Sequence, residues 1–195
     1  LGHAPTAPRC GLALSGGGFL GLYTAGVLAG LEARARAPLG RSFELMAGTS
    51  IGALLALALA FEVPMKRIVQ LFVDRGGEVF SEHGLPAGAV RRLLDLTRSV
   101  LGPKYSGDPL RSMLEAEFGD ARLGQARHPV IVPAVEIQRS RTKIFKSPHA
   151  GQPERDADCR VVDVAMAACA APAYFPAVAI GGRLYADGGL FAVAP

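Results

Sequence analysis

A serine flanked by two glycines constrains this chain more than any other feature of the sequence. The motif Gly48-Thr49-Ser50-Ile51-Gly52 follows an apolar stretch at 43–47 and opens an apolar run at 51–61. This context predicts a strand, a sharp turn and a helix, with the serine hydroxyl held up at the turn. Glycine on either side removes side chains that would collide in so tight a bend. Ser50 is therefore a candidate nucleophile, and the alternative is a serine that only caps the following helix.

The apolar run at 51–61 is much shorter than the roughly 20 residues that a membrane-spanning helix needs. We therefore expect it to form a helix buried inside the fold. A chain of 195 residues, of which 50% are hydrophobic and 19% charged, suits one well-packed domain. We place this domain at 10–195, and we interpret the proline-containing residues 1–9 as a flexible lead-in.

A second glycine motif, Ser15-Gly16-Gly17-Gly18, lies between a predicted strand and a predicted helix. Consecutive glycines let backbone N–H groups converge on an anion, either a phosphate or the oxyanion of an acyl-transfer intermediate. No lysine follows as a phosphate-binding loop requires, although the glycines at 16, 18 and 21 satisfy the dinucleotide-binding pattern. The serine motif downstream favours the oxyanion interpretation, because a nucleophile at such a turn needs a second donor loop.

The third motif is Asp187-Gly188-Gly189, which follows a predicted hairpin at 178–186 with Gly181-Gly182 at its turn. An aspartate at a strand end without bulky neighbours can approach another side chain closely. Taken alone, the motif is more typical of a turn aspartate. Beside the other two motifs, Asp187 becomes a candidate general base.

Strands and helices alternate along the chain, which predicts an α/β fold: three layers, α/β/α, with a largely parallel central sheet.

Pro133 argues that the strand at 130–137 lies at an edge or contains a bulge. Asp108 is expected to cap a helix that has Pro109 at its first position. The expected strands are 10–15, 43–47, 130–137, 142–146 and the hairpin at 178–186; the expected helices are 19–36, 51–61, 64–74, 93–101, 108–118 and 161–170. The helix at 19–36 has apolar residues near one face: Leu20, Tyr23, Val27, Leu28 and Leu31.

The net charge of +4 suits an anionic membrane surface or an anionic ligand. The chain has no tryptophan and no basic run interleaved with aromatics, so we expect no binding to DNA or RNA duplexes.

The three cysteines have neither a disulfide framework nor metal-binding spacing, and we expect no metal or cofactor. Cys10 and Cys169 lie in apolar stretches and are expected to be buried. No signal peptide is evident, which favours a reducing, cytoplasmic location.

Together and in this order, the three motifs resemble the patatin-like phospholipase family, over about 11–195. The residues Leu14 to Gly18 match that family's oxyanion loop, and the serine and aspartate motifs match those of its catalytic dyad. Ala170-Ala171-Pro172 with Phe175-Pro176 also resembles the segment that precedes the aspartate motif. The resemblance implies a lipid acyl hydrolase that acts on membrane phospholipid, peripherally at the inner membrane surface.

By this resemblance Ser50 is the nucleophile and Asp187 its general base. The implied oxyanion donors are the N–H groups of Gly16, Gly17, Gly18 and Ile51. A competing interpretation takes His149 as the base. Leu20, Leu22 and Tyr23, or the residues 80–88, are candidates for an apolar rim through which lipid enters.

The match departs from the family pattern in two places. Leu20 stands where the family usually has a basic residue, and residues 191–195 lack the asparagines that often follow the aspartate motif. The family's domain also usually continues further, which implies a fragment or a minimal variant. These departures leave a second function open: a catalytically weak or inactive module that binds lipid or nucleotide.

Residues 15–23 and 145–149 are also similar to bacterial patatin-like effectors of anti-phage defence, which are activated by cyclic oligonucleotides. This similarity implies a cyclic oligonucleotide as a candidate activator. A homo-oligomer is a separate candidate assembly of this chain. The similarity gives four cations a candidate anion-binding role, with a solvated strand face as the alternative: Arg139, Arg141, Lys143 and Lys146.

Overall fold

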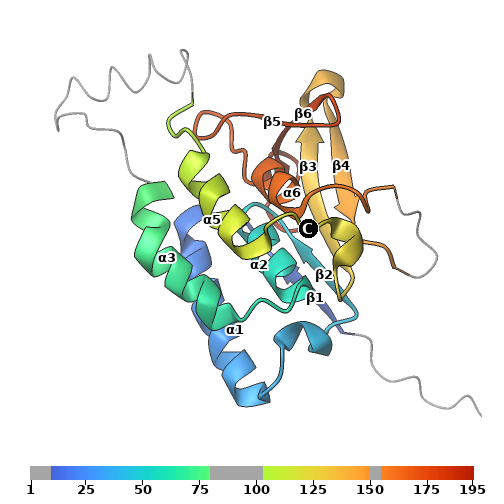
Figure 1. Ribbon diagram of the computed structural model, residues 1–195. Coiled ribbons are helices and arrows are strands. Elements are labelled where there is room, and N and C mark those ends of the chain that lie inside the picture. Colours follow the sequence, from blue (N-terminus) through green and yellow to red (C-terminus); the bar gives the residue numbers. More distant parts are fainter. Residues whose placement is uncertain (1–9, 80–102, 150–154) are drawn as a thin grey trace, which may run out of the picture.

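A computed structural model describes residues 10–79, 103–149 and 155–195 (Figure 1). The lead-in at 1–9, the helix expected at 93–101 and the rim candidate at 80–88 lie outside the described residues. None of the described helices combines the length and the apolar character needed to cross a bilayer.

A six-stranded mixed sheet forms the centre of the fold. The strands β1, β2 and β3 are parallel, whereas β3 is antiparallel to β6 and to β4, and β6 is antiparallel to β5. The predicted hairpin at 178–186 and the predicted strand partner at 142–146 are therefore confirmed, as is the α/β class. The bounds are Gly11–Leu14 (β1), Leu45–Gly48 (β2), Val130–Glu136 (β3), Arg141–Lys146 (β4), Val178–Ile180 (β5) and Arg183–Asp187 (β6).

Strand β3 holds the sheet together because three strands pair with it. β4 pairs along 131–136, whereas β2 pairs only with Val130 and Ile131, and β6 only with 134–136. Because a strand has two edges, β2 and β6 share the edge opposite β4, and their carboxyl ends face each other. This arrangement creates a gap in the sheet beside Val132 and Pro133.

The prediction that Pro133 marks an edge strand or a bulge is wrong, because β3 is central. Successive residues of a strand point their N–H and C=O groups to alternate edges. Val130 bonds with Ser147 on the β4 side, so Pro133 faces the other edge, in the gap between β2 and β6. The missing N–H of proline costs no ladder bond at that position.

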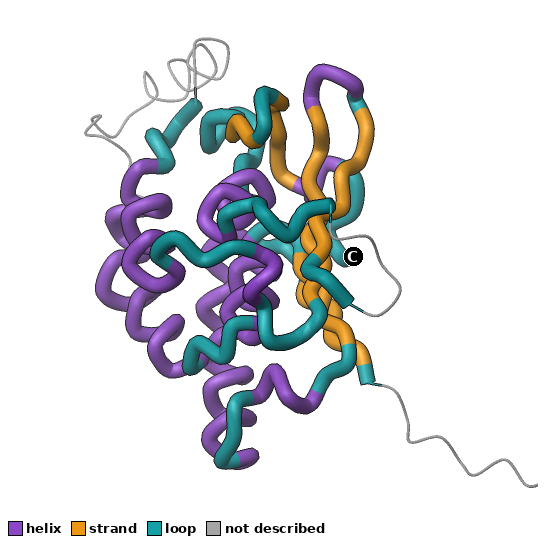
Figure 2. Tube along the Cα trace, turned by 45° about the vertical axis from the view of Figure 1, so that its right-hand side comes forward, coloured by secondary structure: helices purple, strands orange, loops and turns teal. Residues whose placement is uncertain are grey.

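The α-helices lie on one side of the strands in Figure 2. Helices α2 and α6 contact the strands directly, and α1, α3 and α5 pack outside them. Every residue of α2 is buried, because the sheet lies on one side of it and helices on the other. The bounds are Gly21–Ala35 (α1), Ile51–Ala60 (α2), Met65–Val79 (α3), Asp108–Phe118 (α5) and Val161–Ala168 (α6), with short 3-10 helices at Gly18–Leu20 (η1), Leu39–Ser42 (η2), Leu123–Gln125 (η3), Ile137–Arg139 (η4) and Gly188–Leu190 (η5).

Helix α1 points most of its predicted apolar face outward. Leu20, just before the helix, and Tyr23 are 75% and 78% exposed. The helix packs instead through small residues, since a Cβ on Gly21 would lie 2.3 Å from Cγ1 of Ile51. Gly21 and Ala25 let α1 approach the core closely, and Leu28 is buried there, whereas three larger side chains are left exposed: Tyr23, Val27 and Leu31.

Two further expectations need correction. Cys10 is exposed because it precedes β1, the edge strand, whereas Cys169 is buried as predicted. Asp108 does not cap α5: Gly107 occupies the cap position in a left-handed conformation, and Asp108 is the first helical residue, followed by Pro109.

Candidate active site

Ser50 lies in a strained turn between β2 and α2. Its backbone has φ 54° and ψ −126°, in a region that residues with a side chain rarely adopt. It occupies the cap position of α2, yet its side chain makes no capping hydrogen bond. The hydroxyl is therefore not used to satisfy the helix end.

The glycines of the serine motif are required by close backbone contacts. A Cβ on Gly48 would lie 2.1 Å from the Gly52 carbonyl oxygen, and a Cβ on Gly52 would lie 2.3 Å from that of Leu14. Contacts this short leave no room for any side chain at either position. The motif thus packs the turn against the end of β1, which leads into the second glycine loop.

Asp187 ends β6 and is 5% exposed. Its carboxylate accepts the N–H of Gly189 at 2.7 Å, and its own N–H donates to the Ala170 carbonyl at 2.9 Å. A Cβ on Gly188 would lie 2.4 Å from the Pro133 carbonyl oxygen, so glycine is needed for the chain to turn against β3. These contacts fix the position of the carboxylate.

The Ser50 hydroxyl lies close enough to the Asp187 carboxylate to influence its pKa. Burial raises the pKa of Asp187 above its usual value of 3.8, while the bond from the Gly189 N–H and the nearby Ser50 hydroxyl act in the opposite direction. A raised pKa makes the carboxylate a stronger base toward the serine. The structure therefore brings the candidate nucleophile and the candidate base close together.

The glycine loop lies beside Ser50. Gly18 has φ 56° and lines the same pocket as Ser50, and a Cβ on Gly16 would lie 3.2 Å from the Ser50 Cβ. The Gly16 N–H, however, donates to the Val193 carbonyl at 2.8 Å. Of the four predicted oxyanion donors, Gly16 is thus already committed elsewhere, which departs from the prediction. Ile51 begins α2, so its N–H is among the first of the helix, which have no partner within it.

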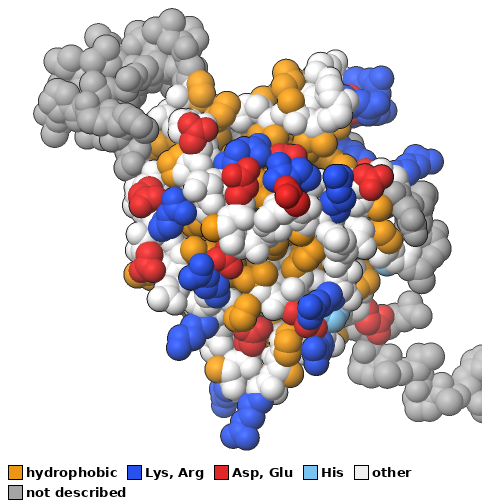
Figure 3. All heavy atoms as spheres, viewed as in Figure 1, with side chains coloured by type: hydrophobic (Ala, Val, Ile, Leu, Met, Phe, Trp, Pro, Cys, Tyr) orange, Lys and Arg blue, Asp and Glu red, His pale blue; other side chains and the backbone are white. Residues whose placement is uncertain are grey.

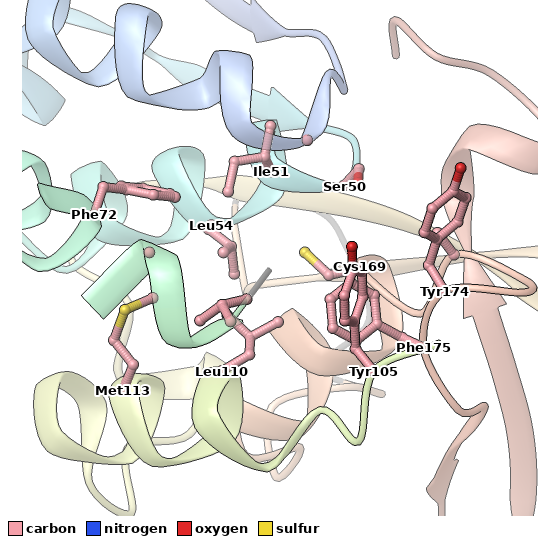
Figure 4. Close-up of a pocket in the computed structure, with 14 residues that line it drawn as sticks. Ser50, Ile51, Leu54, Phe72, Tyr105, Leu110, Met113, Cys169, Tyr174 and Phe175 are labelled. Carbon is pink, nitrogen blue, oxygen red and sulfur yellow. The ribbon is translucent and has the colours of Figure 1, made fainter. Parts of the chain in front are cut away.

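An apolar pocket of about 280 Å³ opens beside Ser50 (Figure 4). Its lining includes the aromatic residues Tyr105, Tyr174 and Phe175 on one side. The remaining labelled side chains come mainly from α2, α3 and α5: Ile51, Leu54, Phe72, Leu110 and Met113. A pocket with this lining suits a hydrocarbon chain rather than a polar ligand.

Cys169 is a member of the site that the sequence analysis placed only in the core. It is 7% exposed, lines the pocket with Ser50, and its thiol lies close to the Ser50 hydroxyl. Burial and the nearby charge of Asp187 raise the pKa of this thiol well above its usual value, so it stays neutral. The one available sequence signal was its position directly before the Ala170-Ala171-Pro172 segment.

His149 does not meet the serine. Its Nδ1 lies 2.8 Å from the Ser147 carbonyl oxygen, and Ser147 bonds to Val130 at the opposite end of β3 from the residue that pairs with Asp187. Among the described residues no histidine lines the Ser50 pocket. The interpretation with His149 as base therefore has no geometric support.

The patatin-like phospholipase family profile matches residues 12–195. The chain belongs to this family. Patatin-like relatives include a "cGAMP-activated phospholipase" from Pseudomonas aeruginosa, which is 43% identical over 184 residues, covering 94% of this chain and 53% of the relative. A protein of the same name from Escherichia coli is 34% identical, and the match covers 94% of this chain and 52% of the relative. Patatin-like protein 2 from Arabidopsis thaliana is 31% identical, and the match covers 85% of this chain and 43% of the relative. The chain spans about half the length of the curated relatives it matches.

The patatin-like fold is also found in a solved structure. VipD from Legionella pneumophila superposes with a TM-score of 0.56 at 15% identity, over 93% of this chain and 46% of VipD. Identity this low supports the fold alone.

Proposed function

We propose that this chain is a serine acyl hydrolase that cleaves phospholipid esters through the Ser50–Asp187 dyad. The observation that carries the proposal is the proximity of a strained serine, whose hydroxyl makes no capping bond, to a buried aspartate of raised pKa at an apolar pocket. An ester with a fatty acyl chain would place its hydrocarbon among Leu54, Leu110 and Met113, with its carbonyl carbon at Ser50.

The first half of the reaction transfers the acyl group to the enzyme. Ser50 Oγ attacks the ester carbonyl carbon while Asp187 accepts the hydroxyl proton. The carbonyl oxygen becomes an oxyanion, held by the N–H groups of Gly17, Gly18 and Ile51, each of which is worth roughly 3 kcal/mol in such sites. The ester bond then breaks, and Asp187 returns the proton to the departing alcohol oxygen.

The second half restores the enzyme. Asp187, ionised again, takes a proton from water, whose oxygen attacks the acyl-serine carbonyl at the same donors. The tetrahedral intermediate collapses with release of the fatty acid, and Ser50 regains its proton from Asp187. Proton and charge balance without a metal or a cofactor.

Labelling with a fluorophosphonate tests the nucleophile. The wild-type chain is expected to react at Ser50, and Ser50→Ala should lose both the label and fatty acid release from phospholipid vesicles. The matched control is Ser42→Ala, an exposed serine that lies before β2 and outside the pocket. Labelling that persists in Ser50→Ala would refute the assignment.

The same experiment separates the second candidate function, a catalytically inactive module that binds lipid or nucleotide. The exposed Leu20, which puts no positive charge near the glycine loop, favours this alternative. Such a module would bind phospholipid vesicles but show neither labelling nor fatty acid release.

The relatives suggest how the activity is controlled and where it acts. Two of them, 43% and 34% identical to this chain, are named for activation by cGAMP. We infer that a cyclic nucleotide activates this phospholipase as well, that its substrate is the phospholipid of the inner membrane surface, and that the activity belongs to anti-phage defence. The test is fatty acid release from vesicles with and without cGAMP, and equal rates in both would remove this regulation.

A further inference from the structure

We propose that a second pocket, on the far half of strands β3 and β6, binds the phosphodiester groups of a nucleotide or a lipid headgroup. We call it the Glu136 pocket. Its volume is about 560 Å³, within the range of small-molecule sites, and among the described residues its lining and that of the Ser50 pocket have no member in common. The charged residues of its lining are Glu136, Arg141, Lys143, Arg155, Asp156 and Arg183.

Positive charge exceeds negative charge around Glu136. This carboxylate is 2% exposed and faces three guanidinium groups, those of Arg139, Arg141 and Arg183. Among the described residues that line the pocket, four cations face two carboxylates, which leaves a net positive charge: Arg141, Lys143, Arg155 and Arg183 against Glu136 and Asp156. Figure 3 shows Lys and Arg side chains gathered at the upper right, beside the ends of β3 and β4.

The guanidinium groups also have spare hydrogen-bonding capacity. Their N···O distances to Glu136 are 3.5, 3.4 and 3.6 Å, longer than the roughly 2.8 Å of a strong charge-assisted bond. Each arginine side chain is about half exposed, so a ligand can reach it from solvent. Arginine forks of this kind match the paired oxygens of a phosphate.

The other wall of the pocket supplies different chemistry. Lys143 pairs with Asp156 and lies over the Phe145 ring, 5.1 Å from its centroid, so this cation is held in place. Ile180 adds apolar surface to the lining, and the rings of Phe145 and Tyr185, which are 2% and 4% exposed, lie beneath it. A ligand that carries phosphodiesters together with planar apolar groups, as a cyclic dinucleotide does, matches both walls.

The Glu136 pocket lies along β6, the strand that ends in the candidate base Asp187. Glu136 pairs with Tyr185 on β6, Arg183 begins β6, and Asp187 ends it. A ligand that draws Arg183 away from Glu136 therefore acts on the strand that positions the candidate base. This regulatory role rests on the proposed function, whereas anion binding itself does not.

Isothermal titration of the protein with cGAMP, and separately with inorganic pyrophosphate, tests the pocket. We expect the double variant Arg141→Gln/Arg183→Gln to bind each anion at least tenfold more weakly. Arg34→Gln/Lys66→Gln removes two exposed cations from α1 and α3 and should bind like the wild type. Arg141→Lys/Arg183→Lys keeps the charge without the fork and should be intermediate, which controls for misfolding.

Glu136→Gln gives the sharpest result. Removal of the competing carboxylate should strengthen anion binding severalfold, whereas a purely structural role of Glu136 would leave binding equal or weaker. Titration with phosphatidylglycerol vesicles identifies the source: if vesicles bind with the same dependence on Arg141 and Arg183 and cGAMP does not, the ligand is a lipid headgroup.

The proposal is overturned if the wild type binds none of the three probes, or if the arginine variants bind like the wild type. Fluorophosphonate labelling of wild-type Ser50 is measured in the same samples. Anion binding without labelling would refute the proposed hydrolase and support the anion site. Labelling without anion binding would support the hydrolase and refute the anion site.

Discussion

Ser50 and Asp187 meet because the strands that end beside them, β2 and β6, approach each other head-on along one edge of β3. β3 carries neither residue, yet it sets the distance between them through its pairing with both strands. The gap between the two strand ends is the place where a hydroxyl and a carboxylate can touch without interrupting the sheet.

Asp187→Asn is expected to abolish hydrolysis and to stabilise the fold at neutral pH. Burial raises the pKa of Asp187, so the folded state holds the proton more tightly than the unfolded chain. The resulting stability is present at low pH and is lost as the pH rises from the usual carboxyl range through the raised pKa. Asparagine removes the buried charge and can still accept the Gly189 N–H. Urea unfolding at low and neutral pH measures this, with the exposed Asp74→Asn as control; equal stability of wild type and Asp187→Asn at neutral pH would contradict it.

The rate of ester hydrolysis should fall on acidification, with a midpoint above the usual aspartate value of 3.8. The reason is that the base must be ionised and its pKa is raised by burial. A pH profile of kcat on a water-soluble ester gives the midpoint. A midpoint that disappears in His149→Ala would assign the base to that histidine instead.

Two glycine-to-alanine changes should have opposite effects on stability. In Gly52→Ala the new Cβ meets the Leu14 carbonyl oxygen at 2.3 Å, and we expect a loss of about 1–3 kcal/mol from this overpacking. In Gly30→Ala, within α1, the new Cβ meets nothing, and we expect a gain of about 0.5–1 kcal/mol. Chemical denaturation measures both. A neutral Gly52→Ala would show that the turn can relax.

The size of the Ser50 pocket should set the acyl-chain preference. Leu110→Trp fills the part of the pocket between α2 and α5 and leaves the dyad unchanged. We expect kcat/KM to fall at least tenfold for esters of long fatty acids and little for acetate esters. A uniform fall across chain lengths would instead indicate damage to the dyad or the fold.

Glu62 should be a determinant of acid stability. Its hydrogen bond with Arg41 lowers the pKa of Glu62 to about 2, with Arg127 and His128 adding to the effect against the opposing influence of burial. The stability that these partners give is complete above the usual value of 4.5 and is lost as the pH falls toward 2. Glu62→Gln should therefore make the free energy of unfolding depend less steeply on pH in the acid range. A dependence as steep as that of the wild type would contradict this.

Local chemistry made several features of the fold predictable. The strand, turn and helix around Ser50 follow from an apolar stretch, two glycines and an alanine–leucine run, and the β5–β6 hairpin follows from Gly181-Gly182. Other features depend on neighbours distant in the chain. The sequence does not reveal that Pro133 faces a gap between two strand ends, or that α1 packs through Gly21 and leaves Tyr23 exposed.

The sequence by itself determined the chemical groups, because a glycine-flanked serine, a glycine loop and an aspartate before two glycines are specified by residue type and spacing. Tertiary structure decided which groups meet and which are already engaged. It brings Ser50, Asp187 and Cys169 together, commits the Gly16 N–H to Val193, and keeps His149 at the other end of β3. The physical reason is that hydrogen bonding and desolvation act over a few ångströms, and distances of that size between remote residues are set by strand pairing rather than by sequence order.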